Sequence, residues 1–279
     1  MKMKQILDKA VLKLQSEGLT SFLDDSEQYV RNRAKSKVEN SMIYQDEFLF
    51  NLCTEIRHRW HRFRYIAPPP PWRPIWINPA DINYKNNIIM RGVGLGIIKG
   101  GEWDQNNNLT PVEDYFKYKG MKQHFLEGKD WENTVYYEHV KNSFERDGSR
   151  AGYGTLEEFR DKRLQYIDTL FESIKNEGYR PNFEASHNVP EVDDRNEQYD
   201  QQLEPLVVIG RKGGIYIHDG WHRFFIAREL GIDPIPVNVL ARHRRWQVLR
   251  DEVFEASDRS ELSSDIQTYV DHPDMHDLL

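Results

Sequence analysis

The stretch VVIGRKGGIYIHDGWHRFFIARELGIDPIPVNV, residues 207–239, decides the fold of this 279-residue chain. Its apolar runs at 207–209 and 215–217 flank a glycine-containing turn, so they predict two strands that form a hairpin. The run from about 221 to 230 predicts a helix that ends at a glycine, and 235–240 predicts a further strand. Strands that alternate with a helix in this order indicate an α/β fold.

The junction between the second strand and the helix carries the parts of a phosphate-binding corner. A helix N-terminus offers unpaired amides and a partial positive charge. Gly220 would let an anion approach the backbone, while His222 and Arg223 would add donors on the first turn. Trp221 could stack on a base or sugar, or it could wedge the helix against the core. The corner from Asp219 to Arg223 therefore predicts the binding of a phosphate group.

Helical patterns surround this passage. The segment Thr155–Glu158 is a capping box, which predicts a helix that ends at Gly178. Apolar residues at helical spacing predict further helices over about 4–17 and 41–64. The segment 110–147 is rich in aromatic and charged residues and is expected to be mostly helical.

A connector of prolines separates the N-terminal helices from the rest of the chain. The run at 67–74 must end the preceding helix, because proline lacks the amide donor and clashes with the turn before it. The segment 75–82 then predicts a strand. The glycine-rich segment 91–98 predicts a hairpin that allows close backbone approach.

The corner resembles the ParB/sulfiredoxin superfamily, in which a strand, a turn and a helix with a Gly-x-His-Arg or Gly-x-x-Arg signature bind nucleotide phosphates. The segment 170–178 is similar to the helix that ends in Ser-Ile-x-x-x-Gly in ParB-type domains, and 74–82 is similar to their first strand. The Asp-Gly-x-His-Arg form at 219–223 is most similar to that of the free serine kinases of this superfamily. The resemblance implies a small mixed sheet, nucleotide binding, and phosphoryl transfer or nucleotide hydrolysis.

The resemblance also sets the expected domain boundaries. Residues 1–73 would form an N-terminal helical extension, and 74–246 the nucleotide-binding domain. That domain would carry insertions at 83–154 and 183–203. The remaining residues, 247–279, would be an acidic tail.

Two departures from the superfamily narrow the function. Sulfiredoxins carry a reactive cysteine where this chain has Trp221, and the single cysteine here, Cys53, lies far upstream, which excludes sulfiredoxin chemistry. Chromosome-partitioning ParB proteins carry a helix-turn-helix domain after the nucleotide domain, whereas only the acidic tail follows here. We therefore expect a kinase or nucleotide hydrolase that acts on a small hydroxyl-bearing or glycan-type acceptor. The alternative is a non-catalytic nucleotide-sensing module or a ParB-like DNA-associated protein.

Phosphoryl transfer needs a divalent cation, a base and positive charge over the phosphates. Glu102 and Asp104 follow the glycine-rich segment, which could bring them to the corner as base and metal ligand, or they could form only an exposed acidic turn. Asp219 could bind the acceptor or the metal, or it could only cap the helix. Lys99 could meet a phosphate or be solvated. The expected cofactors are ATP, or another nucleotide, and Mg²⁺.

Charge is unevenly distributed along the chain. Lys and Arg total 38 against 45 Asp and Glu, which gives a net charge of −7 and argues against nucleic acid as a partner. By contrast, the segment 57–80 holds five arginines and no acid. Such a run could be an anion-binding surface or a solvated, internally paired face.

The remaining composition indicates a cytoplasmic protein. A single cysteine excludes a disulfide scaffold and multi-cysteine metal sites, and it fits a reducing compartment. No stretch approaches about 18 apolar residues, so no transmembrane segment is expected, and the N-terminus lacks the features of a signal peptide. The basic amphipathic helix at 4–17 could contact a membrane surface peripherally or pack on its own domain.

Overall fold

The computed structural model describes residues 47–278, apart from 89–93, 183, 185–202 and 257. The chain divides into two compact units, Met1–Asp46 and Glu47–Leu279, and only the second contains described residues. The helix expected over 4–17 therefore lies outside the described part of the chain.

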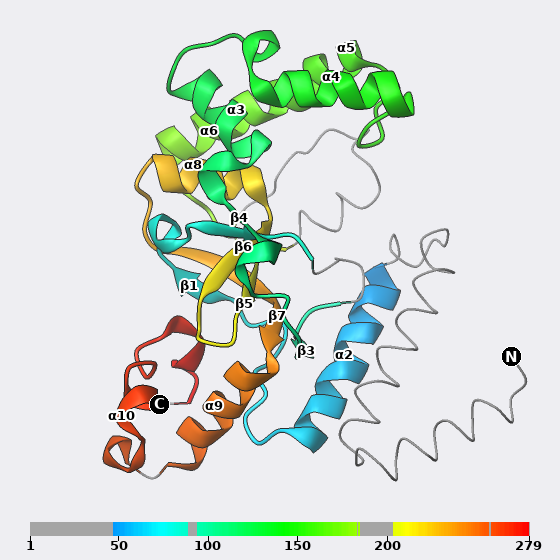
Figure 1. The fold of residues 1–279 in the computed structure, drawn as a ribbon. Coiled ribbons are helices and arrows are strands. Elements are labelled where there is room, and N and C mark those ends of the chain that lie inside the picture. Colours follow the sequence, from blue (N-terminus) through cyan, green and yellow to red (C-terminus); the bar gives the residue numbers. More distant parts are fainter. Residues whose placement is uncertain (1–46, 89–93, 183, 185–202, 257, 279) are drawn as a thin grey trace, which may run out of the picture. The chain divides into compact units, whose positions relative to one another are not determined.

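A mixed sheet forms the centre of the second unit (Figure 1). Its strands within the described residues are β1 (Ile75–Ile77), β2 (Tyr84–Asn86), β3 (Ile97–Lys99), β4 (Leu109–Pro111), β5 (Leu206–Ile209), β6 (Ile215–Asp219) and β7 (Ile235–His243). The order is β1-β7-β5-β6-β2-β4, and β3 also pairs with β7. β7 is parallel to β5 and β3 and antiparallel to β1. β6 is antiparallel to β5 and parallel to β2, which is antiparallel to β4.

Helices lie at both ends of the sheet, and α2 packs beside it. They are α2 (Glu47–Arg64), α3 (Phe116–Phe125), α4 (Val135–Asp147), α5 (Leu156–Glu158), α6 (Gln165–Glu177), α8 (Trp221–Glu229), α9 (Arg244–Glu255) and α10 (Ser264–Gln267). A π-helical segment, Phe159–Leu164, joins α5 to α6, and short 3-10 turns cover Pro79–Asp81, Asn106–Asn108, Val112–Asp114, Trp131–Asn133, Arg259–Glu261 and Pro273–Met275. Figure 1 shows α3 to α6 beside α8 at one end of the sheet, and α9 and α10 at the other. No helix of the described residues is both long and apolar enough to cross a membrane.

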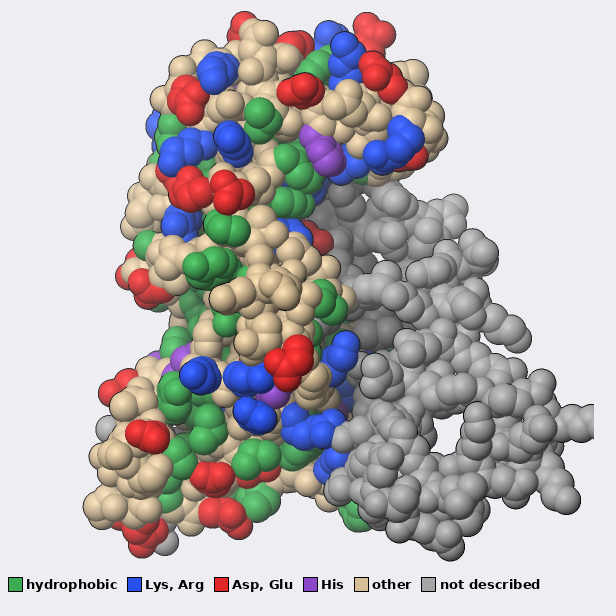
Figure 2. All heavy atoms as spheres, in the orientation of Figure 1, with side chains coloured by type: hydrophobic (Ala, Val, Ile, Leu, Met, Phe, Trp, Pro, Cys, Tyr) green, Lys and Arg blue, Asp and Glu red, His purple; other side chains and the backbone are tan. Residues whose placement is uncertain are grey.

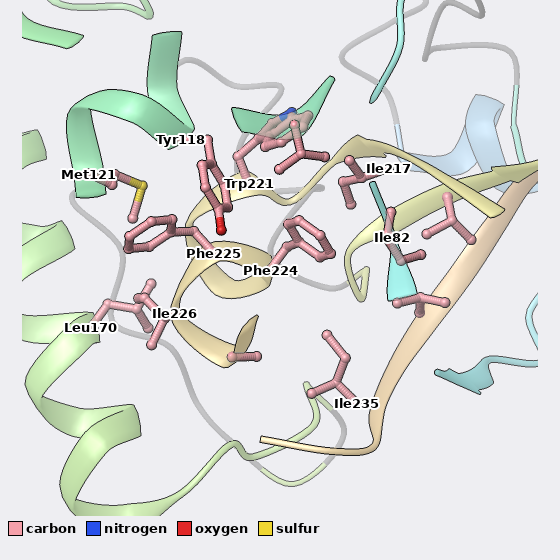
Figure 3. Packing of buried hydrophobic residues seen from close by; sticks show 14 of the residues in the cluster. Ile82, Tyr118, Met121, Leu170, Ile217, Trp221, Phe224, Phe225, Ile226 and Ile235 are labelled. Carbon is pink, nitrogen blue, oxygen red and sulfur yellow. The ribbon is translucent and has the colours of Figure 1, made fainter. Parts of the chain in front are cut away.

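The sheet has two apolar faces, because successive side chains of a strand point to opposite sides. On one face, Ile217 joins a large core with Phe224 and Phe225 of α8 (Figure 3). On the other, Val208 joins a smaller core with Trp103, against which α2 also packs. Every residue of β5 and β7 is buried, as is typical of strands covered on both faces.

The local sequence signals predicted these elements well. The hairpin, the helix after it and the following strand are confirmed as β5, β6, α8 and β7, and the α/β class is confirmed with them. The cap by Thr155 is confirmed, because its Oγ1 accepts a hydrogen bond from the amide of Glu158 at 3.1 Å. The Glu158 carboxylate also reaches back, but it accepts from the amide of Gly154 at 3.3 Å. The first strand ends at Ile77, before the expected residue 82, because Pro79 begins a 3-10 turn capped by Asn78.

The glycine-rich segment does not form the expected hairpin within its described residues. Ile97 lies opposite Ala241 in a parallel pairing of β3 with β7, so the segment runs along the sheet instead of folding back on itself. This pairing fixes Lys99 opposite His243, at the end of β7.

Both α2 and the C-terminal tail pack within this unit. Arg57 Nη1 of α2 donates to the carbonyl oxygen of Leu95 at 2.9 Å. The amide of Ala67, in the proline connector, donates to Asp251 of α9 at 2.9 Å. Asp274 of the tail pairs with Arg242 of β7. Residues 73 and 246, expected as domain boundaries, therefore lie inside one packed unit.

Asp274 provides a test of this packing. Burial acts to raise its pKa, but Arg242 and Arg250 hold the pKa of its carboxyl down to about 2. In Asp274→Asn both buried guanidinium groups lose a counter-charge, so we expect the free energy of unfolding in urea to fall by about 3–5 kcal/mol. The exposed substitution Asp265→Asn should change it by less than about 0.5 kcal/mol. Equal urea midpoints for Asp274→Asn and the wild type would contradict this role.

Candidate anion-binding site

Helix α8 begins at Gly220, and close packing explains why this residue is glycine. Its φ angle is 79°, and an added Cβ would lie 2.6 Å from Cα of Pro205. The amide of Gly220 donates to Oδ1 of Asp219 at 2.7 Å, which orients that carboxylate. The space expected for an anion beside the glycine Cα is thus taken by Pro205 on this side, and any ligand must meet the helix at its first turn.

Arg223 links α8 to Asn182 and to the segment that precedes β5. Its Nη1 donates to Asn182 Oδ1 at 2.6 Å and to Glu204 Oε2 at 3.1 Å, and its Nη2 donates to the carbonyl of Leu203 at 2.5 Å. Burial raises the pKa of Glu204, against the effect of Arg223. Arg223 therefore pairs with the buried carboxylate of Glu204. Its guanidinium group, which was expected to bind a phosphate, already donates its hydrogen bonds within the protein.

His222 is buried and neutral. Arg163 Nη2 lies 3.5 Å from its Nδ1, and Tyr136 Oη lies 3.3 Å from its Nε2. Because arginine only donates, Nδ1 is the acceptor and the ring proton is assigned to Nε2. Burial, followed by the charges of Arg163, Lys117 and Arg223, lowers the pKa of His222 well below 6.5.

Trp221 is a packing residue. Its ring lies 4.3 Å from the ring of Tyr115 between centroids, and its Nε1 donates to the carbonyl of His218 at 3.3 Å. Its side chain is buried in the large core, as Figure 3 shows. Of the two expected roles, the structure supports the wedge and leaves no face of the ring for a base.

Four cations from other segments act on groups of the first turn of α8 or on Tyr115, which packs against it. Lys117 of α3 and Arg163 of the π-helical segment both act on His222, and Arg150 acts on Tyr115. Lys85 of β2 lies over the ring of Tyr115, 5.1 Å from its centroid. Burial lowers the pKa of Lys85, although Asp219 opposes this. We name the set Lys85, Lys117, Arg150, Arg163 and Asp219–Arg223 the α8 corner.

The N-terminus of α8 differs from that of α9 in its capping. No side chain caps α8, whose N-cap is Gly220. In α9 the N-cap His243 accepts a hydrogen bond from the amide of Arg245 through Nδ1, at 3.0 Å. First-turn amides without a side-chain cap can donate to an anion, so the start of α8, unlike that of α9, keeps this capacity.

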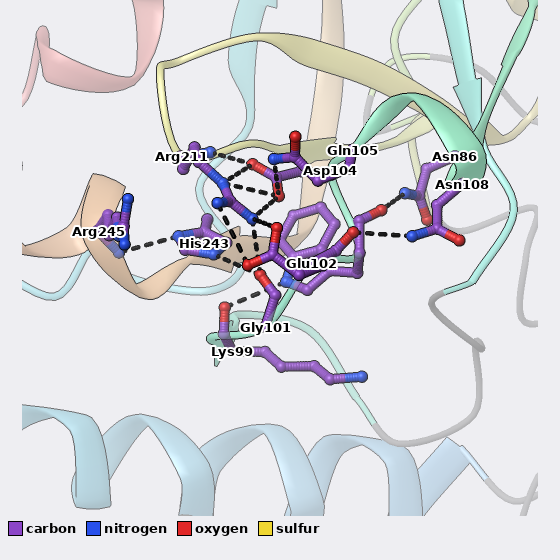
Figure 4. A network of polar contacts seen from close by, with 11 residues as sticks. Asn86, Lys99, Gly101, Glu102, Asp104, Gln105, Asn108, Arg211, His243 and Arg245 are labelled. Atoms are coloured by element: carbon purple, nitrogen blue, oxygen red, sulfur yellow. Dashed lines mark hydrogen bonds and ion pairs between the residues drawn. The ribbon is translucent and has the colours of Figure 1, made fainter.

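The acids expected at the corner lie elsewhere, which corrects their assignment as base and metal ligand. Asp104 accepts from the amide and guanidinium of Arg211, and Glu102 Oε2 lies 3.0 Å from Arg211 Nη2 (Figure 4). Arg211 lies in the β5–β6 turn, whereas Gly220 follows the opposite end of β6. The five residues of β6 span about 13 Å, so these carboxylates do not meet Asp219.

The second cluster is a structural ion pair. Burial acts to raise the pKa of Asp104, but hydrogen bonds from Arg211 outweigh it and lower the pKa. Lys99 also belongs to this end of the sheet, and its side chain points away from the Arg211–Asp104 pair in Figure 4. Lys and Arg side chains gather at this end in Figure 2, but Arg211 is already paired with the carboxylates of Glu102 and Asp104.

The described residues contain no group of three His, Cys, Asp or Glu side chains that could hold a metal ion. Asp104 and Asp219, both expected as metal ligands, lie at opposite ends of β6. Asp219 is the one carboxylate among the residues that define the α8 corner.

Comparison with known proteins finds no relative of this chain. No protein-family model matches the sequence, and no curated protein or solved structure matches it either. The function has to be inferred from the geometry of the α8 corner.

Sequence reasoning did not single out Lys85, Lys117, Arg150 or Arg163 as site residues. Arg163 precedes His222 by 59 residues and lies on the polar side of a helical pattern, where a solvated role is usual. The sequence signal that could have indicated them is their positive charge, since all four lie within or just after the expected insertion at 83–154.

The buried His222 makes stability depend on pH. As the pH falls below about 6.5, His222 binds a proton in the unfolded chain but stays neutral in the folded protein. The free energy of unfolding therefore decreases. In His222→Gln this contribution disappears, and the slope between pH 6.5 and 5 should fall by up to about 1.4 kcal/mol per pH unit. Urea unfolding at several pH values measures it, with the exposed His276→Gln as control. Identical slopes for His222→Gln and wild type would refute a neutral buried His222.

Proposed function

We propose that the protein binds the phosphate groups of a nucleotide at the α8 corner and transfers or hydrolyses a phosphoryl group. The acceptor would be a small hydroxyl-bearing or glycan-type molecule, or water. The supporting observation is that Arg163 Nη2 lies 3.5 Å from Nδ1 of His222, on the first turn of α8, whose N-terminus has no side-chain cap. Lys85 lies over the ring of Tyr115, which packs on Trp221 of the same turn.

The arrangement suits polyphosphate for electrostatic reasons. The nine-residue α8 directs its amides and the positive end of its dipole at the corner. Arginine binds phosphate oxygens in a forked geometry, and lysine adds a point charge. The phosphoryl group spreads negative charge over three oxygens as it transfers, and cations held in place by the fold stabilise that charge without rearranging.

Asp219 is the candidate base. Its carboxylate is oriented by the amide of Gly220, and it lies near enough to Lys85 and Tyr115 to affect the pKa of each. A carboxylate in this position could accept the proton of the attacking hydroxyl. Magnesium bound with the nucleotide would neutralise phosphate charge, and Asp219 is the residue of the corner that could ligate it.

A nucleotide-sensing module without turnover is the second candidate. It is favoured by one observation: Glu102 and Asp104, the two carboxylates expected to complete a catalytic set, bind Arg211 at the other end of the sheet. The two candidates share the binding step and differ in the role of Asp219.

A thermal-shift panel of ATP, ADP, CTP and GTP, with and without magnesium, tests the binding step. A ligand at about 100 times its dissociation constant should stabilise the protein by roughly 2.7 kcal/mol. Arg163→Gln should reduce the shift, because it removes a phosphate donor. Arg160→Gln, which removes a partly exposed arginine of the same π-helical segment that pairs with Asp161, should leave it unchanged. No shift with any nucleotide at millimolar concentration, or equal loss in both variants, contradicts the site.

The same preparations separate transfer from sensing. Asp219→Asn should lower magnesium-dependent turnover by about 10²- to 10⁴-fold while the nucleotide shift persists, because loss of a positioned base affects the chemical step. A wild-type protein that binds but shows no turnover would support the sensing module. Unchanged turnover in Asp219→Asn would remove Asp219 from the mechanism.

A further inference from the structure

Helix α2 carries an apolar stripe that points away from the described part of the protein. The stripe recurs every three or four residues, which places its members on one side of the helix. Its members are 41% to 86% exposed, and they are Phe48, Leu52, Ile56, Trp60 and Phe63, which we name the outer face of α2.

The opposite side of α2 holds the helix on the sheet. Thr54 is fully buried and its Oγ1 accepts from the amide of Leu95 at 3.0 Å, while Arg57 donates to the carbonyl of the same residue. His61, two turns further on, is also buried. Since these residues fix one side of α2, the outer face is left without a partner among the described residues.

The exposed apolar area is large for a surface helix. Three aromatic side chains of about 150–250 Å² each are 70%, 48% and 86% exposed, which amounts to roughly 300–500 Å² before the two aliphatic residues are added. A contiguous patch of this size marks an interaction site more often than ordinary surface.

Positive charge accompanies the stripe. At 100° per residue, Arg59 falls within the outer face, and Arg62 and the exposed Glu55 fall at its margin. Both arginines are exposed without an ion pair to any described residue. The acids of α2 are Glu47 and Glu55, and Glu55 accepts a hydrogen bond from Trp72 Nε1 at 3.1 Å. No acid occurs from 57 to 80, so a locally cationic surface lies on an acidic chain.

We propose that the outer face of α2 docks on an anionic lipid bilayer surface. A helix with Phe, Trp and Leu on one face and arginines beside them lies in the interface, where the rings enter the acyl boundary and the guanidinium groups reach lipid phosphates. A second copy of the chain fits less well. Two crossed helices alone bury less than the roughly 800 Å² per partner of a standard interface, and a second α2 also brings its own arginines.

Vesicle binding of the full chain tests this proposal, which does not depend on the nucleotide site. Phosphatidylcholine vesicles that contain phosphatidylglycerol should sediment the protein, and vesicles of phosphatidylcholine alone should bind it weakly. Raising the salt concentration should weaken the anionic binding. The single cysteine, Cys53, is exposed on α2, so an environment-sensitive fluorophore attached there should report apolar surroundings on binding.

Matched variants locate the binding surface. Phe63→Ser should weaken anionic-vesicle binding by at least about tenfold, and Arg59→Gln and Arg62→Gln by about fivefold each. Phe254→Ser on α9 removes a phenylalanine that is also exposed, and Arg146→Gln removes an exposed arginine of α4. These controls should bind as the wild type does, and all variants should keep its melting temperature.

Three results would overturn the proposal. One is the absence of binding to anionic vesicles, and another is an equal loss in Phe63→Ser and Phe254→Ser. The third is a dimer in light scattering that Phe63→Ser dissociates while lipid has no effect, which would assign the face to a second copy.

Discussion

The contact between Gly220 and Pro205 is the constraint on which the α8 corner depends. A side chain at Gly220 would collide with the backbone of Pro205, so glycine alone allows the two segments to meet. The carbonyl of Pro205 accepts from the amide of Asn238 in β7 at 3.0 Å, and the amide of Glu204 donates to Oδ1 of the same asparagine at 2.9 Å. With the Arg223–Glu204 pair, this contact fixes the start of α8 against β5 and β7.

The length of β6 then separates two kinds of charged cluster. At the β5–β6 turn, Arg211 is matched by Glu102 and Asp104, so its charge is used within the fold. At the other end of the strand, Arg163, Lys117 and Arg223 act on the buried His222, and the helix start has no side-chain cap. The first arrangement stabilises a turn, whereas the second is the site of the proposed phosphate binding.

Local signals in the sequence were sufficient for the elements but not for the site. The hairpin, α8 and the Thr155 cap follow from residues within a few positions of one another, and all are found. The partners of the corner are distant in sequence: Arg163 meets His222 across 59 residues, and Arg223 meets Asn182 across 41. The expected position of Glu102 and Asp104 failed because β3 pairs in parallel with β7, a non-local choice that no nearby residue indicates.

A titration with inorganic pyrophosphate, followed residue by residue through backbone amide chemical shifts, tests the central claim most directly. Binding at the α8 corner predicts saturable shifts of the amides from Gly220 to Arg223, with the β5–β6 turn unaffected. Shifts confined to the turn around Arg211, or shifts that never saturate at 220–223, would contradict the assignment of the corner as the phosphate site.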